Sequence, residues 1–128
     1  MKTVKDILEE KGHQVWSIAP DATVYEALKV MGEREVGALT VVDGGNLVGI
    51  VSERDYARKV ILRGKTSRET RVREIMTAAV VTTSPEQTVE ECMATMTERR
   101  IRHLPVIERG RMVGMVSIGD LVKSIIAE

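Results

Sequence analysis

Hydrophobic and polar positions along the chain change their period several times, and the same changes recur in its second half. In two places a threonine stands three residues before a glutamate, which is the spacing of a capping box at a helix start. Apolar residues at helical spacing follow each threonine. The matched positions are Thr23, Val24, Glu26, Ala27, Leu28 and Met31, and then Thr88, Val89, Glu91, Cys92, Met93 and Met96. The pattern therefore predicts one capped helix in each half of the chain.

Two apolar runs follow each predicted helix, with a glycine-containing turn between them. The runs are residues 38–42 and 47–51 in the first half, and 104–107 and 112–116 in the second. Gly45 and Gly110 stand in the turns, where glycine adopts a positive φ at little cost, so each pair of runs predicts a β-hairpin. The runs are apolar throughout and do not alternate, which favours strands buried on both faces.

Further elements complete each half. Residues 15–18 are a short strand candidate, and helices are expected at residues 53–62 and 118–127, directly after the hairpins. Short apolar and charged segments, residues 4–8 and 72–76, precede the two halves.

The two halves are copies of each other. Matched residues lie 65 positions apart, as Pro20 and Pro85 do, with no gap between residues 19 and 61. A repeat of this length exceeds the 20–50 residues of a solenoid unit. The sequence therefore predicts two half-domains related by a pseudo-two-fold axis, so that any site between them comes as a related pair.

Repeat 1 is expected at residues 1–63 and repeat 2 at residues 72–128, with a polar and basic segment at 64–71 between them. That segment is interpreted as a solvated linker, and a contribution to anion binding is the alternative. The segments before the two repeats lie 68 positions apart, so three extra residues near 11–13 predict a loop that differs between the copies.

Composition narrows the class of protein. The 128 residues suit one domain, and 43% are hydrophobic without any Phe, so the core must be aliphatic. Nineteen basic residues balance nineteen acidic ones, which argues against a nucleic-acid or membrane-surface binder. A single cysteine, Cys92, excludes an internal disulfide and suits a reducing compartment. No apolar stretch of targeting or spanning length is present, so we expect a soluble cytoplasmic protein.

The strand-to-helix junctions carry the strongest candidate chemistry. Ser52 and Asp55 recur as Ser117 and Asp120, each pair at the expected start of a helix. Free amides and the helix dipole suit an anion there, a serine hydroxyl can bind phosphate, and an ionised aspartate accepts from two adjacent ribose hydroxyls. The alternative is that the same spacing only caps a helix. Its retention in both copies, each with a glycine three residues before the serine, favours a binding role.

A second candidate lies before the second hairpin, where Arg102 and His103 could bind phosphates. A solvated charged turn is the alternative, and both stay open. The first copy is small and neutral at the corresponding positions, so the two sites cannot be chemically equal. Trp16 could cover an adenine ring or fill a gap, whereas Cys92 is expected in the core and His13 in an exposed loop.

Catalysis has little support in the sequence. There are only two histidines, with no metal-ligand spacing, no nucleophile elbow and no glycine-rich phosphate loop. We therefore expect a binding module and no enzyme, without a catalytic cofactor or a bound metal.

Three motifs together resemble a known family. Ser84-Pro85 before a Thr-capped helix, the segment from His103 to Val106, and two Gly-x-x-Ser-x-x-Asp junctions are similar to a tandem pair of cystathionine β-synthase (CBS) domains, a Bateman module of the stand-alone bacterial type. The resemblance covers essentially the whole chain. It implies an α/β (α+β) fold of two β-α-β-β-α repeats packed through their sheets. It also implies clefts that bind AMP, ADP, ATP or NAD(H).

In this family each site takes its Ser and Asp from one repeat and its adenine-contacting residues from the other. The resemblance therefore implies a first site of Ser52, Asp55, Val80, Val81, Ile101, Arg102, His103 and Pro105. It implies a second site of Ser117, Asp120, Val15, Trp16, Val36, Gly37 and Ala38. Arg54 and Arg58 are additional phosphate candidates at the first site. The chain departs from the family pattern at Thr40, where the second copy has Pro105, and in the loop at residues 11–13.

These observations lead to the hypothesis of a regulatory adenine-nucleotide sensor. The resemblance implies a homodimer, and we expect it to relay ligand binding to an unknown effector. The sequence leaves open which nucleotide is physiological. Two alternatives are a nucleotide-independent interaction adaptor, and a nucleic-acid patch formed by Arg99, Arg100, Arg102 and the basic segment 64–71.

Overall fold

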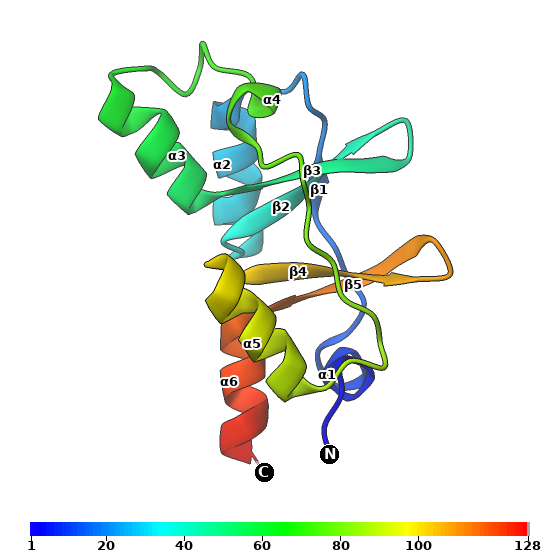
Figure 1. Cartoon of the computed structure of the whole chain (residues 1–128). Coiled ribbons are helices and arrows are strands. Elements are labelled where there is room, and N and C mark those ends of the chain that lie inside the picture. The colour runs from blue at the N-terminus through cyan, green and yellow to red at the C-terminus, as the bar shows by residue number, and fades with distance from the viewer. Residues whose placement is uncertain (128) are drawn as a thin grey trace. The chain divides into compact units, whose positions relative to one another are not determined.

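The computed structural model describes residues 1–127 and divides the chain into two compact units (Figure 1). Unit 1 combines Met1–Val15 with the chain from Val81 onward, and unit 2 is the continuous stretch Trp16–Val80. Both units contain helices and a small sheet, so the expected mixed fold class is confirmed.

Unit 2 contains a three-stranded sheet in the order β1-β2-β3, in which β1 is parallel and β3 antiparallel to β2. Its strands are β1 (Ser17–Ile18), β2 (Ala38–Asp43) and β3 (Asn46–Ser52). Its helices are α2 (Val24–Arg34), α3 (Glu53–Lys59), the 3-10 turn η1 (Ile61–Arg63) and α4 (Val72–Ile75). In Figure 1 the turn of the hairpin points away from α2 and α3.

Unit 1 repeats this plan with a two-stranded antiparallel sheet. Its strands are β4 (His103–Glu108) and β5 (Arg111–Ser117), and its helices are α1 (Val4–Lys11), α5 (Val89–Arg99) and α6 (Ile118–Ala127). Each unit has its own aliphatic core, as the composition requires. Cys92 is buried in the core of unit 1, where burial raises the pKa of its thiol.

The predicted capping boxes are confirmed at both principal helices. The hydroxyls of Thr23 and Thr88 accept from the amides of Glu26 and Glu91, and each glutamate accepts from the amide of its threonine. These backbone hydrogen bonds favour the ionised carboxylates, so they lower the pKa of both glutamates. The sequence therefore fixes where α2 and α5 begin.

The hairpin turns also follow the prediction. Gly44 and Gly45 have φ values of 57° and 86°, and Arg109 and Gly110 have 52° and 76°. Two successive positive φ values are typical of a type I′ turn, which matches the twist of the strands. Arg109 therefore adopts a conformation that glycine tolerates better than any residue with a Cβ.

The number of strands differs between the units because of one residue pair. Thr40 of β2 donates its amide to the carbonyl of Trp16 at 3.2 Å, which ties β1 to the sheet. The matching residue in unit 1 is Pro105, which has no amide hydrogen to donate. Only an isolated parallel bridge between Thr83 and Val106 remains there. The departure at Thr40 therefore has a structural consequence in the sheet.

The compact units do not follow the boundaries expected from the repeat, namely 1–63, 64–71 and 72–128. Helix α1 precedes the first repeat in sequence, but Val4 and Leu8 belong to the core of unit 1. A backbone bridge between Thr3 and Thr88 aligns α1 with the start of α5. Helix α4 is joined in the same way to the start of α2 in unit 2, so the lead segment of each repeat packs against the other repeat's elements.

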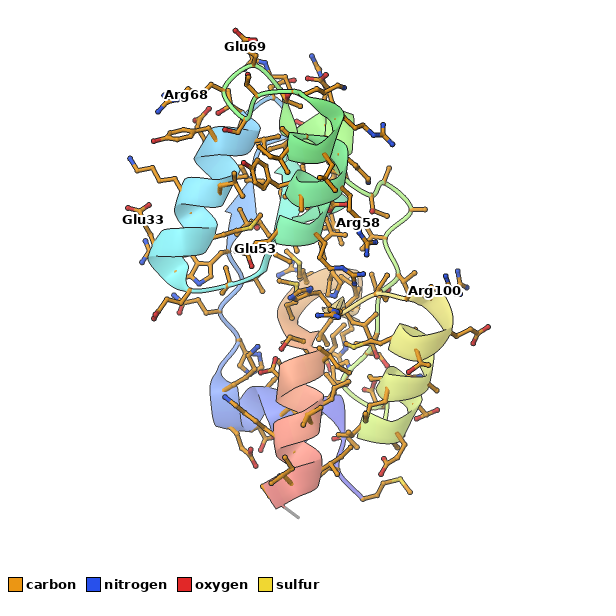
Figure 2. All side chains as sticks on the ribbon, turned by 90° about the vertical axis from the view of Figure 1, so that its left-hand side faces the viewer. Glu33, Glu53, Arg58, Arg68, Glu69 and Arg100 are labelled. Carbon is orange, nitrogen blue, oxygen red and sulfur yellow. The ribbon has the colours of Figure 1, made fainter. Side chains whose placement is uncertain are left out.

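Residues 64–71 are packed within unit 2. The carbonyls of Ser67 and Thr70 accept from the first amides of α2, and Thr70 is only 3% exposed. Figure 2 shows Arg68 and Glu69 on this loop beside α2, where the Arg68 guanidinium stacks on Tyr25 at 3.9 Å. The charged side chains of this segment thus agree with the interpretation as a solvated linker, whereas its backbone is hydrogen-bonded to α2.

Candidate functional site

The predicted Ser-Asp pair of unit 2 forms a complete capping box at the start of α3. The Asp55 amide donates to Ser52 Oγ at 3.2 Å, and the Ser52 amide donates to Asp55 Oδ2 at 2.9 Å. The amide of Glu53 donates to the carbonyl of Gly37 at 3.1 Å. Three of the four amides at this helix start are therefore used, and the expectation that they are free for an anion is wrong.

The start of α6 in unit 1 has the same arrangement. The Ser117 amide donates to Asp120 Oδ2 at 2.8 Å, the Asp120 amide donates to Ser117 Oγ at 3.2 Å, and the Ile118 amide donates to the carbonyl of Arg102 at 2.9 Å. The capping interpretation is thus correct for both junctions. It does not exclude binding, because hydroxyl and carboxylate groups retain further hydrogen-bonding capacity.

Each of the two aspartates forms an ion pair with a different lysine, and the sequence analysis predicts neither pair. Lys11 Nζ lies 2.7 Å from Asp120 Oδ2 and also donates to the Met115 carbonyl at 2.9 Å. In unit 2, Lys59 Nζ lies 3.1 Å from Asp55 Oδ1. The i,i+4 spacing of Asp55 and Lys59 could have indicated the second pair, whereas no local signal marks Lys11.

Electrostatics distinguish two groups around the start of α6. Burial pushes the pKa of Asp120 upward, but the hydrogen bonds from Lys11 and from the Ser117 amide outweigh it, so the pKa lies below its ordinary value. His103 lies opposite Ser117 in the hairpin register. Burial lowers its pKa, and the charges of Lys11 and Arg102 act in the same direction while Asp120 opposes them. The arrangement thus combines an ionised carboxylate, an ammonium and an imidazole with a depressed pKa.

The two glycines before the serines serve packing. A Cβ on Gly49 would lie 2.6 Å from Met76 Sδ, and a Cβ on Gly114 would lie 2.7 Å from a methyl carbon of Leu8. These glycines let α4 and α1 approach the strands closely. Their recurrence therefore has a structural explanation, which weakens the argument that took it as a sign of binding.

The predicted site residues divide between the units. Unit 1 contains Val15, Val81, Ile101, Arg102, His103, Pro105, Ser117 and Asp120, and unit 2 contains Trp16, Val36, Gly37, Ala38, Ser52, Arg54, Asp55, Arg58 and Val80. Within unit 1 the structure brings His103 next to Ser117, although the resemblance assigns them to different sites. Within unit 2 it pairs Ala38 with Ser52. Each expected site takes residues from both units, so its composition stays a prediction.

The apolar candidates lie at the edges of the two cores. Trp16 and Val36 pack against the core of unit 2, and Val81 and Ile101 pack against the core of unit 1. The Arg34 guanidinium stacks on the Trp16 ring at 4.1 Å from its centroid, so this ring already has a partner within unit 2.

The basic candidates are exposed. Arg54 and Arg58 lie on α3, where Figure 2 labels Arg58, and Arg102 lies just before β4. Their exposure leaves the guanidinium groups accessible to an anion.

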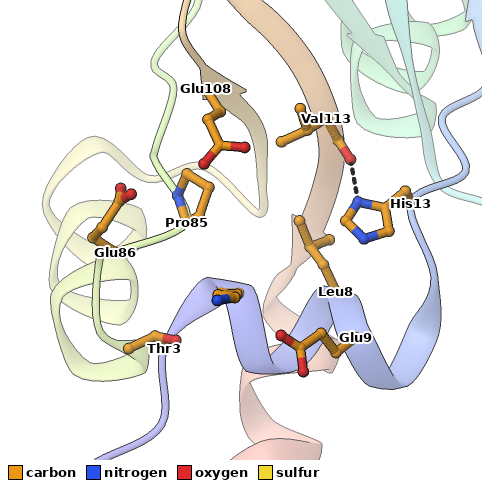
Figure 3. A pocket seen from close by; sticks show the side chains of 9 residues that line it. Thr3, Leu8, Glu9, His13, Pro85, Glu86, Glu108 and Val113 are labelled. Carbon is orange, nitrogen blue, oxygen red and sulfur yellow. Dashed lines mark hydrogen bonds between the residues drawn. The ribbon is translucent and has the colours of Figure 1, made fainter.

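A pocket of about 460 Å³ lies elsewhere in unit 1 (Figure 3). It is lined by Thr3, Lys5, Leu8, Glu9, His13, Pro85, Glu86, Glu108 and Val113. None of the sequence-predicted site residues belongs to this lining. The expected exposure of His13 is confirmed, and its Nδ1 also hydrogen-bonds the Val113 carbonyl at 2.8 Å. Exposed charges of both signs surround an apolar floor, which points to no particular ligand.

Two further features of residues 1–127 concern metal ligands and membrane spans. In this range no three His, Cys, Asp or Glu side chains are grouped so that they could hold a metal ion. None of the helices described is both long and apolar enough to cross a bilayer. The cytoplasmic location stays a prediction.

Comparison with known proteins agrees with the resemblance drawn from the motifs. The family model described as CBS domain matches residues 4–62 and 72–127. The chain is 44% identical over 136 residues to the CBS domain-containing protein CBSX3, mitochondrial, of Arabidopsis thaliana. The match covers 98% of this chain and 66% of that protein.

Solved structures show the same similarity. A protein with CBS domains from Burkholderia ambifaria MC40-6 superposes with a TM-score of 0.97 at 52% identity, covering 99% of this chain and 96% of that one. The CBS domain pair of protein MJ0100, crystallised with 5′-methylthioadenosine and S-adenosyl-L-methionine, gives a TM-score of 0.88 at 28% identity. That match covers 99% of this chain and 98% of the other.

Proposed function

The chain belongs to the CBS domain family, and from this premise we propose that it is a regulatory module that binds adenine nucleotides. The proposal covers AMP, ADP, ATP and NAD(H), whose binding the module relays to an effector protein of unknown identity. It assigns the chain no catalytic activity of its own.

One observation carries the proposal: the same Ser-Asp pair stands at the start of both α3 and α6. In each pair the serine hydroxyl accepts from the aspartate amide and the aspartate carboxylate accepts from the serine amide, which holds the two side chains together. Both aspartates are partly exposed, so an adenosine ribose can reach them. The MJ0100 pair, which binds two adenosine derivatives, supports a ligand of this class.

The proposed sites follow the residues expected from the family. Ser52 and Asp55 would bind sugar and phosphate at one site, and Ser117 and Asp120 at the other. The apolar residues would enclose adenine, and Arg54, Arg58, Arg102 and His103 would contact phosphates. The depressed pKa of His103 keeps its imidazole neutral at pH 7, so it would act as a hydrogen-bonding group and not as a cation.

We also propose a homodimer that uses exposed apolar side chains of α6. Val122, Ile125 and Ile126 are exposed there, and Ile126 has 79% of its surface accessible. Exposed apolar side chains grouped on one helix favour association. Light scattering coupled to size-exclusion chromatography would detect the dimer, and Ile126→Lys should shift the mass to that of a monomer.

Binding is tested first by a melting-temperature panel with AMP, ADP, ATP, NAD⁺ and NADH. A ligand at a thousand times its dissociation constant stabilises the folded state by about 4 kcal/mol, which is readily measured. No shift with any of these ligands would refute the nucleotide proposal and favour a nucleotide-independent adaptor.

Asp55→Ala should weaken the tightest ligand at least about tenfold in calorimetry, since a lost hydrogen bond to a charged group has that effect. The substitution also removes a helix cap, so a matched control is needed. Glu26→Ala removes the same kind of cap from α2 and lies outside the proposed sites. Equal affinities of the two variants would remove Asp55 from the site.

A further inference from the structure

The carboxylate of Asp120 is already engaged by a residue distant in sequence. Its Oδ2 atom accepts from the Ser117 amide at 2.8 Å and from Lys11 Nζ at 2.7 Å. Those two donors use the two lone pairs of that oxygen. A ribose whose two adjacent hydroxyls each bind one oxygen of this carboxylate must therefore displace the ammonium of Lys11 from Oδ2.

Further contacts hold the end of α1 beside this site. Lys11 Nζ also donates to the carbonyl of Met115 at 2.9 Å, on the strand that leads into α6. Two residues later, His13 Nδ1 hydrogen-bonds the carbonyl of Val113 on the same strand at 2.8 Å. The end of α1 is thus held along β5, and a displaced Lys11 stays beside the ligand.

Displacement has a different cost for different ligands. Asp120 is only 20% exposed at its side chain and Lys11 38%, so separating them leaves a cation in a partly desolvated place. A ligand with a phosphate next to its ribose supplies a new anionic partner for the ammonium. An uncharged nucleoside supplies no such partner, so its binding breaks the ion pair between Lys11 and Asp120 without replacing it.

We propose that Lys11 is a specificity-determining residue, which makes the Asp120 site select nucleotides that carry a phosphate over uncharged nucleosides. The inference rests on the proposed function, because it requires that this site binds an adenosine-containing ligand. It goes beyond that function by assigning the selectivity to one residue outside the Ser-Asp motif.

Two single-site proteins make the test specific. Asp55→Asn weakens the site that contains Ser52 and Asp55, so that binding reports on the Asp120 site, and Asp120→Asn does the reverse. Calorimetry then measures AMP and adenosine against each protein with and without Lys11→Met, which removes the charge and keeps the length of the side chain. Lys59→Met is the matched control, because it removes a lysine paired with the other aspartate.

In the Asp55→Asn protein we expect AMP to bind at least about tenfold more tightly than adenosine, and Lys11→Met to bring the two affinities close together. Lys59→Met should leave the preference unchanged there. If AMP and adenosine bind but Lys11→Met leaves their ratio unchanged, the role of Lys11 is refuted and the proposed function stands. If the unsubstituted chain binds no adenosine-containing ligand, both proposals fall together.

Discussion

The two units differ in how the backbone groups at one strand edge are hydrogen-bonded. In unit 2, Ile50 of β3 exchanges two backbone hydrogen bonds with Thr77, at 3.0 and 2.9 Å. In unit 1 the matching residue is Met115 of β5, and its carbonyl accepts from the side chain of Lys11. The His13 side chain satisfies the Val113 carbonyl in the same way.

The difference has its origin in the length of the lead helix. Helix α4 has four residues and the chain then runs as a backbone bridge beside β3, whereas α1 has eight and ends in a loop with two polar side chains. A backbone bridge persists through most substitutions, but a contact made by side chains changes with one residue. Duplicated units can thus keep their fold while one of them acquires a contact that is open to change.

The largest effect is expected where the lead helix meets its core. Leu8→Ala removes a side chain that is 1% exposed and packs on Gly114, so it should lower the free energy of unfolding by about 3 kcal/mol. The matching residue in unit 2, Met76, is only half-buried, and Met76→Ala should cost roughly half as much. Urea denaturation of both variants measures the difference, and an equal or larger loss for Met76→Ala would contradict it.

A smaller effect is expected at the two packing glycines. Gly49→Ala should cost about 2 kcal/mol, because the new Cβ meets Met76 and also the Thr77 carbonyl at 3.1 Å, which the backbone bridge holds in place. The three atoms nearest to a new Cβ at Gly114 are side-chain carbons of Leu8 and no backbone atom, so Gly114→Ala should cost about 1 kcal/mol. The reverse order in thermal melts would show that the bridge does not restrain that carbonyl.

The ion pair between Lys11 and Asp120 predicts how the stability of the protein depends on pH. Lys11 lowers the pKa of both Asp120 and His103, so Lys11→Met should raise both, as measured by NMR titration. The lowered pKa of Asp120 contributes stability that is present above the ordinary Asp value of about 3.9 and is lost as the pH falls through the folded-state pKa.

The depressed pKa of His103 also lowers the stability of the protein as the pH falls, but it does so in a higher pH range than Asp120. The unfolded chain binds a proton below about 6.5 that folded His103 resists, so stability falls as the pH drops through that range. The loss between neutral and acid pH should therefore be shallower in Lys11→Met. Arg102, which also lowers the pKa of His103, remains in the variant, and an unchanged His103 titration would mean that Lys11 does not face the imidazole.

The smallest effect is expected at the hairpin turns. Arg109 has a φ of 52° where unit 2 has Gly44 at 57°. Arg109→Gly should stabilise the protein by about 0.5 kcal/mol, since the relief of strain exceeds the added freedom of the unfolded chain. Gly44→Arg should destabilise by a similar or larger amount, and chemical denaturation compares the two. Destabilisation by Arg109→Gly would indicate that the arginine side chain makes contacts that outweigh the strain.

Local patterns predicted most of the fold. The capping boxes at Thr23 and Thr88 and the hairpins with Gly45 and Gly110 follow from short-range spacing, and the family follows from the resemblance of the motifs. The helix expected at residues 53–62 is shorter, because α3 ends at Lys59 and a 3-10 turn follows. Such a change depends on packing beyond the helix, which periodicity does not record.

Long-range pairings could not be predicted from the sequence. The contact of Lys11 with Asp120 joins residues 109 positions apart, and the docking of α1 into unit 1 is equally remote from its own repeat. The sequence identifies the Ser-Asp motifs, but it does not predict the packing role of the glycines before them, because close approach of α1 and α4 is a property of the folded chain. Local spacing identifies candidate groups, and tertiary structure decides which neighbours they have.

Because α1 belongs to unit 1, the two units should differ in how they fold during synthesis and in which fragments of the chain can fold. Unit 2 is one uninterrupted stretch, so it can complete its core during synthesis, before the later residues leave the ribosome. Unit 1 needs both the earliest and the latest parts of the chain, and Val4 and Leu8 must wait for α5 and β5 to arrive. A fragment cut between the repeats would leave α1 without its core, whereas one cut at the ends of Trp16–Val80 would keep every partner of α4.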